Sequence, residues 1–441
     1  MDTSPTTPLV EKWSSDFRSA HNLQGPEWMR ELQASAAAQF SASGLPTRKT
    51  EAWKYTPVRA LETLNPSVSG PAPRARQNVI FPEPVCPAGA VADIGNGCLA
   101  GDLPDTIAGV TLLPLAKGLE AYPEKLQGML ACVDLEGAAR IFTALNTAFL
   151  DQGLVVHVGE NVKAGSLLIR WAFSDEQKAQ LNNFRILLLL DPGAELEIIE
   201  QYESAGETAG ALNVVTQIDL AEGAVLKHIR VQSESDGVVL LTSTSVEQAA
   251  GSNYCYSGFD LGGGLVRHEL DSILAGTGAE AGFNGAFILD RKRHVDNHVS
   301  VEHAARGCSS TQFFRGVLGG SSRGVFNGRA LISPGADESK VKQSNANLLL
   351  STLAEMDTKP ELEIYADEVE AAHGATVGQL DEAAIFYMRS RGLSDKQARR
   401  MLTSAFCHAV TDRIEDRVLA ERIAGMLDAV MPDGLPATGD S

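Results

Sequence analysis

The sequence predicts a mainly β fold, with a β-helix core between helical regions at both ends. Short apolar or alternating runs recur roughly every ten residues from 153 to 372, and most are bounded by Gly, Asp or Asn. Helical patterns occur before and after this region, and no helical pattern long enough for a crossover interrupts it. These observations exclude a doubly wound fold and leave a sandwich, a barrel or a β-solenoid.

Residues 1–65 are predicted to form an N-terminal helical region. The stretch from Val10 to Gln39 is rich in Ala, Glu, Gln and Leu. Its larger apolar residues recur at loosely helical spacing, at Trp13, Phe17, Trp28, Leu32 and Phe40. Residues 66–152 are predicted to be a linker and mixed subdomain. Its linker is marked by Gly70, Pro66, Pro71 and Pro73 with Arg74 and Arg76, and its helix candidate runs from Ala138 to Leu150.

Residues 153–372 are predicted to form the β-helix core. Its strand candidates are 154–158, 167–171, 186–190, 196–199, 214–218 and 238–246. An internal echo favours a solenoid over a sandwich, because the triplet Phe-Asn-Gly occurs at Phe283 and again at Phe326. That spacing fits two coils of roughly 20 to 25 residues each, which is typical of stacked repeats.

Residues 373–441 are predicted to form a C-terminal helical domain. A short helix around Ile385 ends at Arg391 and Gly392, and Ser394 to Gln397 has the spacing of a capping box. The apolar face predicted for the next helix comprises Ala398, Met401, Leu402, Ala405, Phe406, Ala409 and Val410. A further helix is expected from Asp412 to Val430. So small a unit must dock on the body or on a partner to bury its apolar face.

Composition excludes several classes of function. The formal charge of −19, with scattered basic residues, makes nucleic acid an unfavourable partner. The six cysteines are far apart and form no Cys-x-x-Cys pair, so neither a disulfide framework nor a closed zinc site is indicated. No apolar run approaches the roughly 18 residues of a membrane span, and the first residues lack the pattern of a signal peptide. We therefore expect a cytoplasmic protein.

Several motifs resemble chemical sites but fit structural roles better. The run from Gly320 to Gly324 matches Gly-x-Ser-x-Gly, but a strand pattern follows it, so we interpret it as a turn between coils. On a strand, His294 and His298 lie roughly 13 Å apart and His303 points to the opposite face, which is too dispersed for one metal ion. The chain contains no phosphate-binding Gly-x-x-x-x-Gly-Lys-Ser/Thr motif, so we expect it not to hydrolyse ATP unaided. Cys407 follows Phe406 and is expected in the core.

His373 is the best remaining candidate for chemistry. It stands in the segment His373-Gly-Ala-Thr-Val-Gly378, which is expected to be a Gly-rich turn where the strands give way to helices. Loops on a rigid scaffold often carry functional groups, and a histidine there can act as a ligand or proton carrier. The alternative is a turn histidine bonded to nearby backbone.

Three separated segments resemble the SufB/SufD family of iron-sulfur cluster assembly proteins. They are Gly44-Leu-Pro-Thr-Arg-Lys-Thr-Glu-Ala-Trp-Lys-Tyr-Thr56, Ser322-Arg-Gly-Val-Phe-Asn-Gly328 and the stretch from Pro360 to Gly392. The chain length and the segment ending at Thr56 are typical of the SufD type of subunit. The resemblance covers nearly the whole chain. It implies a right-handed parallel β-helix with helical domains at both ends.

The resemblance also implies partners and site residues. The chain would pair with SufB through its β-helix and bind the ABC-type ATPase SufC through its C-terminal helices. The candidate SufC-docking residues are Phe386, Tyr387, Arg389, Arg391 and Gly392. His373 matches the family histidine implicated in cluster assembly and would be a transient iron ligand. The chain itself would be a scaffold rather than an enzyme.

Two departures from the family pattern limit what the chain can hold alone. Ala371 and Ala372 precede the histidine where the family often has a cysteine, and Ser344 occupies the place of the essential cysteine of SufB. The resemblance therefore implies a transient iron-sulfur cluster shared with SufB and no stably bound cofactor in the isolated chain. The cluster type, the iron source, a flavin on the complex and homodimer formation without SufB stay open. The competing hypotheses are a standalone β-helix enzyme acting on polysaccharide and a purely structural partner in which His373 is inert.

Overall fold

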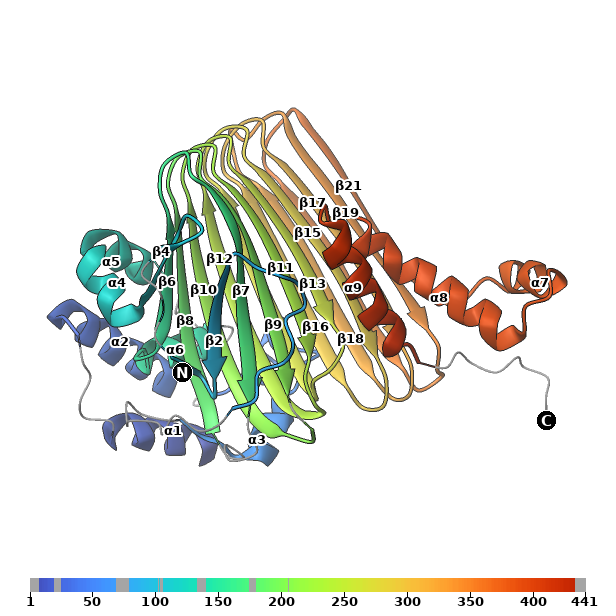
Figure 1. Ribbon diagram of the computed structural model, residues 1–441, viewed down its shortest axis with the longest axis horizontal. Coiled ribbons are helices and arrows are strands. Elements are labelled where there is room, and N and C mark those ends of the chain that lie inside the picture. The colour runs from blue at the N-terminus through green and yellow to red at the C-terminus, as the bar shows by residue number, and fades with distance from the viewer. Residues whose placement is uncertain are drawn as a thin grey trace.

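The computed structural model describes residues 8–19, 25–68, 79–101, 103, 106–132, 140–173, 180–204 and 206–432. Within them the chain forms a two-sheet β-solenoid with helices at both ends, which confirms the predicted fold class (Figure 1). The predicted linker residues from Gly70 to Arg76, and Ala138 at the start of the predicted helix, lie outside the described residues.

The N-terminal region is helical, as predicted. It comprises α1 (Pro8–Ser19), α2 (Glu27–Ser43), the 3-10 helix η1 (Glu51–Trp53) and α3 (Arg59–Leu64). Trp13 and Phe40 from the predicted apolar stripe are buried, with their ring centroids 5.8 Å apart. These helices pack on the outer face of one sheet through Leu181, Ala211 and Val239.

The mixed region after the N-terminal helices closes the first end of the solenoid. Its strands are β1 (Ser67–Val68), β2 (Ala90–Gly95), β3 (Cys98–Leu99), β4 (Thr106–Ile107) and β5 (Val110–Pro114). Its helices are α4 (Leu115–Ala121), α5 (Pro123–Ala131) and α6 (Ile141–Ala148). Strand β5 pairs antiparallel with the first solenoid strand of one sheet, and β2 pairs parallel with that of the other. Both sheets are thereby extended, and α4 and α5 pack on the outer face of the sheet that contains β5.

The solenoid alternates its strands between two parallel sheets. The first sheet, sheet A, contains β6 (Gly153–Val158), β8 (Gln180–Leu190), β10 (Ala209–Leu220), β12 (Gly237–Gln248), β14 (Leu265–Leu274), β16 (His294–His303), β18 (Arg323–Ile332) and β20 (Glu355–Ile364). The second, sheet B, contains β7 (Lys163–Phe173), β9 (Glu195–Ser204), β11 (Val225–Ser233), β13 (Asn253–Asp260), β15 (Glu280–Leu289), β17 (Ser309–Leu318), β19 (Ser339–Leu349) and β21 (Val369–Gly378). All six strand candidates of the sequence fall on these strands.

The period of the solenoid is longer than the sequence echo suggested. Leu265 pairs with His294, and His294 pairs with Arg323, so one turn here takes 29 residues. The expectation of two coils of 20 to 25 residues was therefore wrong. Phe283 lies on β15 of sheet B, whereas Phe326 lies on β18 of sheet A. The echo spans one and a half turns, because each turn contributes a strand to both sheets.

The Phe-Asn-Gly triplet recurs because the interior needs glycine beside large rings. Phe283 and Phe326 both belong to the core between the two sheets. Gly285 is in register with Phe314, and a Cβ at Gly285 would lie 2.3 Å from that ring. Since real Cβ atoms do not approach so closely, the glycine makes room for the ring of the next coil.

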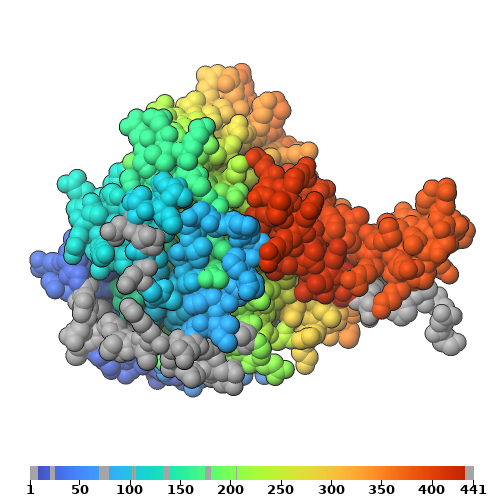
Figure 2. All heavy atoms as spheres, viewed as in Figure 1, coloured from blue at the N-terminus to red at the C-terminus, as the bar shows by residue number. Residues whose placement is uncertain are grey.

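The C-terminal helices form an arm that leaves the last coil. They are α7 (Glu382–Ser390), α8 (Asp395–Thr411) and α9 (Arg417–Ala429). The capping box between Ser394 and Gln397 is present, and Gly392 has a φ of 95° just after α7, as glycine at a helix end allows. Figures 1 and 2 show α9 and the end of α8 against the body, whereas α7 projects from it.

The apolar face predicted for α8 is only partly correct. Ala398 and Val410 are buried, but Met401 is 53% exposed. Arg399 and Thr403, which are not part of the predicted face, are buried. The reason is that only the later part of α8 contacts sheet B, while its start packs against α7, where Arg399 pairs with Glu382 and Asp395.

Candidate functional site at the open end of the solenoid

The last coil of the solenoid is uncovered. Strands β20 and β21 are the end strands of their sheets, and none of their residues is buried. The preceding strands β18 and β19 each bury about half of their residues. Large apolar side chains are exposed along this end, at Leu353 (69%), Ile364 (42%), Tyr365 (62%) and Val377 (44%). Unpaired edge strands with exposed apolar groups are typical of a surface that pairs with another chain.

His373 lies in β21, at the middle of this open coil, and not in a turn. The strand continues to Gly378, beyond the boundary expected at 373, because β21 pairs in register with β19 from Val369 to Gly378. The pairing places His373 beside Gln343. Gln343 points into the solenoid, where its Nε2 donates to the Gly328 carbonyl of the opposite sheet at 3.1 Å. Neighbours in register share a face, so His373 is on the inner face of the open coil.

The inner face behind His373 is lined by amides. In successive coils of sheet B, Gln312 is in register with Gln343, which is in register with His373. Asn345 and Asn347 lie beside this row, and Asn347 Nδ2 donates to Asn345 Oδ1 at 2.6 Å. The inward positions of sheet B are therefore polar in the last coils. In the coil before Gln312 the same position is occupied by Phe283 of the aromatic core.

Ser344, which the resemblance is expected to place where SufB has its cysteine, is not on the same face as His373. It precedes the inward Asn345 on β19 and accepts a hydrogen bond from Arg315 Nη1 at 3.3 Å. Arg315 in turn stacks on Phe313 of the outer face, with 3.8 Å from its guanidinium carbon to the ring centroid. The hydroxyl is thus on the outside of sheet B and the imidazole on the inside. Neither a thiol nor Ser344 accompanies His373 in this chain.

The predicted docking residues lie on the projecting end of the arm. Phe386 is 74% and Tyr387 59% exposed. Arg391 stacks on the Tyr387 ring at 5.2 Å and donates to its hydroxyl at 3.1 Å, while Arg389 lies 3.6 Å from Asp395. The structure therefore leaves all of these residues exposed on α7 and just beyond its end. Phe386 and Tyr387 are adjacent, so α7 exposes two neighbouring aromatic rings, which makes it a candidate contact surface.

The histidines of β16 do not form a metal site. His303 is buried inside, between Ser339 and Ser310, whereas His294 and His298 face outward, as the strand alternation predicted. Burial lowers the pKa of both His294 and His303 to about 4, so both are neutral. Within the described residues, no cluster of three or more His, Cys, Asp or Glu side chains could hold a metal ion. A metal bound at His373 would need ligands from elsewhere.

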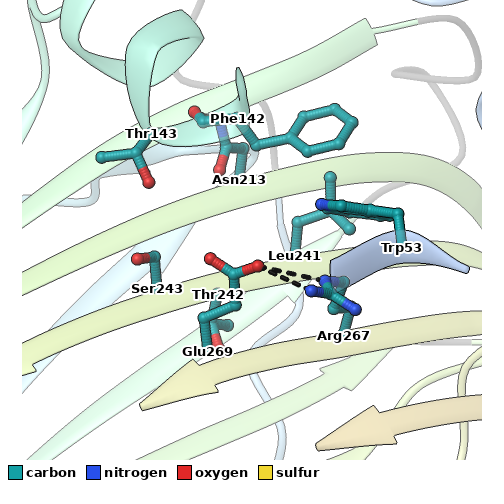
Figure 3. Close-up of a pocket in the computed structure, with 9 residues that line it drawn as sticks. All are labelled: Trp53, Phe142, Thr143, Asn213, Leu241, Thr242, Ser243, Arg267 and Glu269. Atoms are coloured by element: carbon teal, nitrogen blue, oxygen red, sulfur yellow. Dashed lines mark hydrogen bonds and ion pairs between the residues drawn. The ribbon is translucent and has the colours of Figure 1, made fainter. Parts of the chain in front are cut away.

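The outer face of β16 instead anchors the N-terminal region. Trp53 stacks on the Arg267 guanidinium at 3.9 Å, and Thr56 donates to Asp296 at 2.5 Å. Arg267 also pairs with Glu269 (Figure 3). Its second carboxylate partner is Asp296. Burial alone would raise the pKa of Asp296, but Arg267 and the neighbouring His298 hold it well below its usual range. The segment from Glu51 to Thr56, which carries part of the resemblance, thus has a clear structural role.

A small pocket lies beside this anchor. Its walls are Trp53 from η1, Phe142 and Thr143 from α6, and sheet A side chains including Leu241 (Figure 3). Arg267 could not be identified from the sequence as the partner of Trp53, because the contact joins segments more than 200 residues apart. The Arg267 guanidinium is paired with the carboxylates of Glu269 and Asp296. The pocket therefore lies at the contact between the N-terminal helices and sheet A and offers no unpaired guanidinium to a ligand.

The solenoid interior also contains a buried ionic network that the sequence did not indicate. His228 Nε2 lies 2.8 Å from Glu200, which also accepts from Tyr202. One coil further, Arg230 and His268 both bond Asp260, each at 3.0 Å. Burial lowers the pKa of His268 to about 4. Among the described residues, its hydrogen bonds extend to Tyr254, Thr242 and Asn297, which lie in earlier coils than the open end.

The remaining sequence motifs are structural. Gly320 and Ser321 form the turn between β17 and β18, as predicted, and Gly324 already belongs to β18. Cys407 is buried against sheet B, and burial raises the pKa of its thiol to about 12, which makes it inert. No helix among the described residues is both long and apolar enough to cross a membrane.

The geometry defines a class of protein: a parallel β-solenoid with helical ends, an uncovered last coil and a projecting helical arm. A family model described as SUF system FeS cluster assembly, SufBD core domain, matches residues 173–406, which is more than half of the chain. The chain belongs to this family and is of the SufD type.

Three relatives match over most of their length. The iron-sulfur cluster assembly protein SufD of Escherichia coli is 28% identical over 96% of this chain and 97% of its own. An iron-sulfur cluster assembly SufBD family protein of Synechocystis is 27% identical over 86% of both chains. A chloroplastic protein of Arabidopsis thaliana is 25% identical over 89% of this chain and 84% of its own. The chain therefore has a place in the SUF system of iron-sulfur cluster assembly.

Proposed function

We propose that this chain is a non-ATPase scaffold subunit of a SUF assembly complex, working in the cytoplasm. It pairs with a SufB-type subunit through the open end of its solenoid and with a SufC-type ATPase through its C-terminal arm. His373 contributes one ligand to a nascent cluster, which is the cargo of the complex and not a resident cofactor.

The uncovered last coil carries this proposal. Every earlier coil is covered on both sides by neighbouring strands, yet β20 and β21 have free edges and no buried residue. A partner solenoid that continued both sheets would satisfy the free backbone groups and cover Val377 and Tyr365. A SufB-type chain is the natural partner, because it would supply the thiolate that Ser344 does not.

The arm supports the second contact. Phe386 and Tyr387 project from α7 at a distance from the body, where no described part of this chain covers them. Aromatic residues flanked by arginine are typical of the central contacts of interfaces. Because α8 joins α7 to the outer face of sheet B, a movement of the docked ATPase would be transmitted to the last coils.

His373 supports the chemistry. A neutral imidazole binds iron through one nitrogen, and iron accepts mixed imidazole and thiolate ligands. A single histidine on the inner face of an open coil can give only part of a coordination sphere. The other ligands would come from the partner, so the site forms and opens with the interface, and the isolated chain holds no stable cofactor.

The complex is tested by co-expressing this chain, carrying an affinity tag, with the SufB-type and SufC-type proteins of the same organism. We expect all three to be recovered together. Recovery of this chain alone, with both partners soluble, would overturn the proposal.

The ligand role is tested with His373→Ala in the reconstituted complex. We expect a large loss of cluster assembly, followed by absorbance of the forming cluster, while the complex stays intact. Thr376→Ala is the matched control, because Thr376 is exposed on the opposite face of the same strand. Equal assembly by the wild type and His373→Ala would leave the histidine inert and the chain a structural partner.

A further inference from the structure

Gln343 has a buried acceptor without a donor. The side chain is 3% exposed, and its Nε2 donates to the Gly328 carbonyl. Its Oε1 is fully buried and accepts no hydrogen bond. Native proteins pair nearly all buried polar atoms, so this oxygen is available to a donor that comes within reach.

The other polar groups of the last two coils are already committed. Thr358 Oγ1 donates to Asn345 Oδ1 at 2.8 Å, and Asn347 Nδ2 donates to both Asn345 Oδ1 and the Thr376 carbonyl. On the sheet A side, Pro360 pairs with Gly328 and has no N–H to offer. The described side chains therefore leave one donor for Gln343 at this end, which is the imidazole of His373.

His373 is placed to be that donor. It is in register with Gln343 on the next strand, on the same inner face, and both of its ring nitrogens lack a hydrogen-bond partner among the described residues. Neighbouring strands lie about 4.8 Å apart, so rotation about the side-chain bonds of His373 brings one ring nitrogen within reach of Oε1.

We propose that Gln343 is a positioning residue for His373. Its Oε1 accepts the N–H of one ring nitrogen, which fixes the tautomer and leaves the other nitrogen without a proton, directed toward the open end. Histidines that bind metals nearly always donate their second nitrogen to an oxygen in this way, because the bond fixes the ring and makes the free nitrogen more basic. The inference rests on the proposed ligand role of His373 and adds the residue that orients it.

The chain contains matched variants for a test. Gln343→Leu and Gln343→Glu both lose the bond from Nε2 to Gly328, but only Gln343→Glu keeps an acceptor oxygen. Gln312 is one coil further in on the same row, with a buried and unpaired Oε1 but no histidine beside it. Gln312→Leu therefore controls for removing a buried amide from the interior.

The measurement is the tautomer of His373 by nitrogen NMR of the full chain labelled with ¹⁵N-histidine, at alkaline pH, where an ordinary imidazole is neutral. His373→Gln assigns the signals, and thermal melting checks each variant for folding. We expect one tautomer to dominate in the wild type, Gln343→Glu and Gln312→Leu. In Gln343→Leu we expect the ring to shift to a mixture of both tautomers.

The inference would be overturned if the His373 ring of the wild type were already a mixture of both tautomers. It would also be overturned if Gln343→Leu kept the same dominant tautomer as the wild type. The readout needs neither iron nor partners. If the tautomer depends on Gln343 but the chain recovers no partners, the positioning stands and the proposed function fails. If the complex assembles clusters through His373 but the tautomer ignores Gln343, only the positioning role is lost.

Discussion

The carboxyl group of Glu234 should make the stability of the solenoid fall as the pH rises. Glu234 directly follows β11, is 2% exposed, and neither of its oxygens accepts a well-formed hydrogen bond. Burial raises its pKa from 4.5 to about 8, and the nearby Gln232 side chain opposes this shift only weakly. Between these two values the folded chain holds a proton that the unfolded chain has released.

The sign and size of the effect follow from that difference. Below pH 4.5 Glu234 is protonated in both the folded and the unfolded chain, so its burial lowers the free energy of unfolding by nothing through ionisation. As the pH rises toward 8, unfolding is increasingly favoured, because it frees a carboxyl group to ionise in water. A difference of this size corresponds to about 4 to 5 kcal/mol of unfolding free energy at the alkaline limit. Glu234→Gln removes the titrating group while keeping its shape.

The assay is urea unfolding at a series of pH values from 5 to 9, followed by tryptophan fluorescence. Trp171 is buried and stacks on Tyr202 at 5.0 Å, so its emission reports on the interior. We expect Glu234→Gln to unfold at clearly higher urea than the wild type at pH 9, with the gap narrowing toward pH 5. The exposed Glu222→Gln is the control. A gap between Glu234→Gln and wild type that does not change with pH would refute the reasoning.

Three further predictions follow from packing and exposure. Gly285→Ala should destabilise the chain by about 1 to 3 kcal/mol in urea unfolding, because its Cβ would lie 2.3 Å from Phe314. Gly282→Ala on the same strand, with 3.6 Å to the nearest atom, should cost far less, and equal costs would contradict this account. Trp53→Ala should cost about 3 to 5 kcal/mol and expose the N-terminal helices to limited proteolysis, whereas unchanged cleavage would show that Trp53 does not anchor them. Phe386→Asp should leave the melting temperature unchanged but abolish recovery of the ATPase; retained recovery would remove α7 from the proposed interface.

The sequence predicted the solenoid because its signals are local. Strand alternation, turn residues and capping boxes depend on neighbours in the chain, and Ser394 with Gln397 is such a case. The period of the solenoid was predicted wrongly because the two Phe-Asn-Gly triplets lie in different sheets. In sheet B, Gly285 makes room for Phe314 of the next coil, whereas in sheet A, Gly328 lies against Phe326 of its own strand. Both sheets use a glycine beside a large ring, so one echo cannot distinguish a whole turn from a half turn.

The site was harder to predict because its residues are joined across coils. His373 could be singled out as a candidate, but glycines around it suggested a turn, and the pairing of β21 with β19 makes it a strand. No local pattern connects Gln343 with His373, or Trp53 with Arg267. Which residues meet across coils depends on the number of residues in the intervening turns. The two contacts can therefore be identified only once the strand register is known.

The shape of the solenoid explains why its function should lie at its end. Along most of its described length the interior is filled by apolar and aromatic side chains and by a buried ionic network. At β20 and β21 the same inward positions are occupied by Thr358, Pro360 and His373, which a further coil of this chain does not cover. A chain that stops with two free edges and exposed apolar groups leaves its core unfinished. A partner that completes the core would therefore also enclose His373, so formation of the interface and formation of the ligand site become one event.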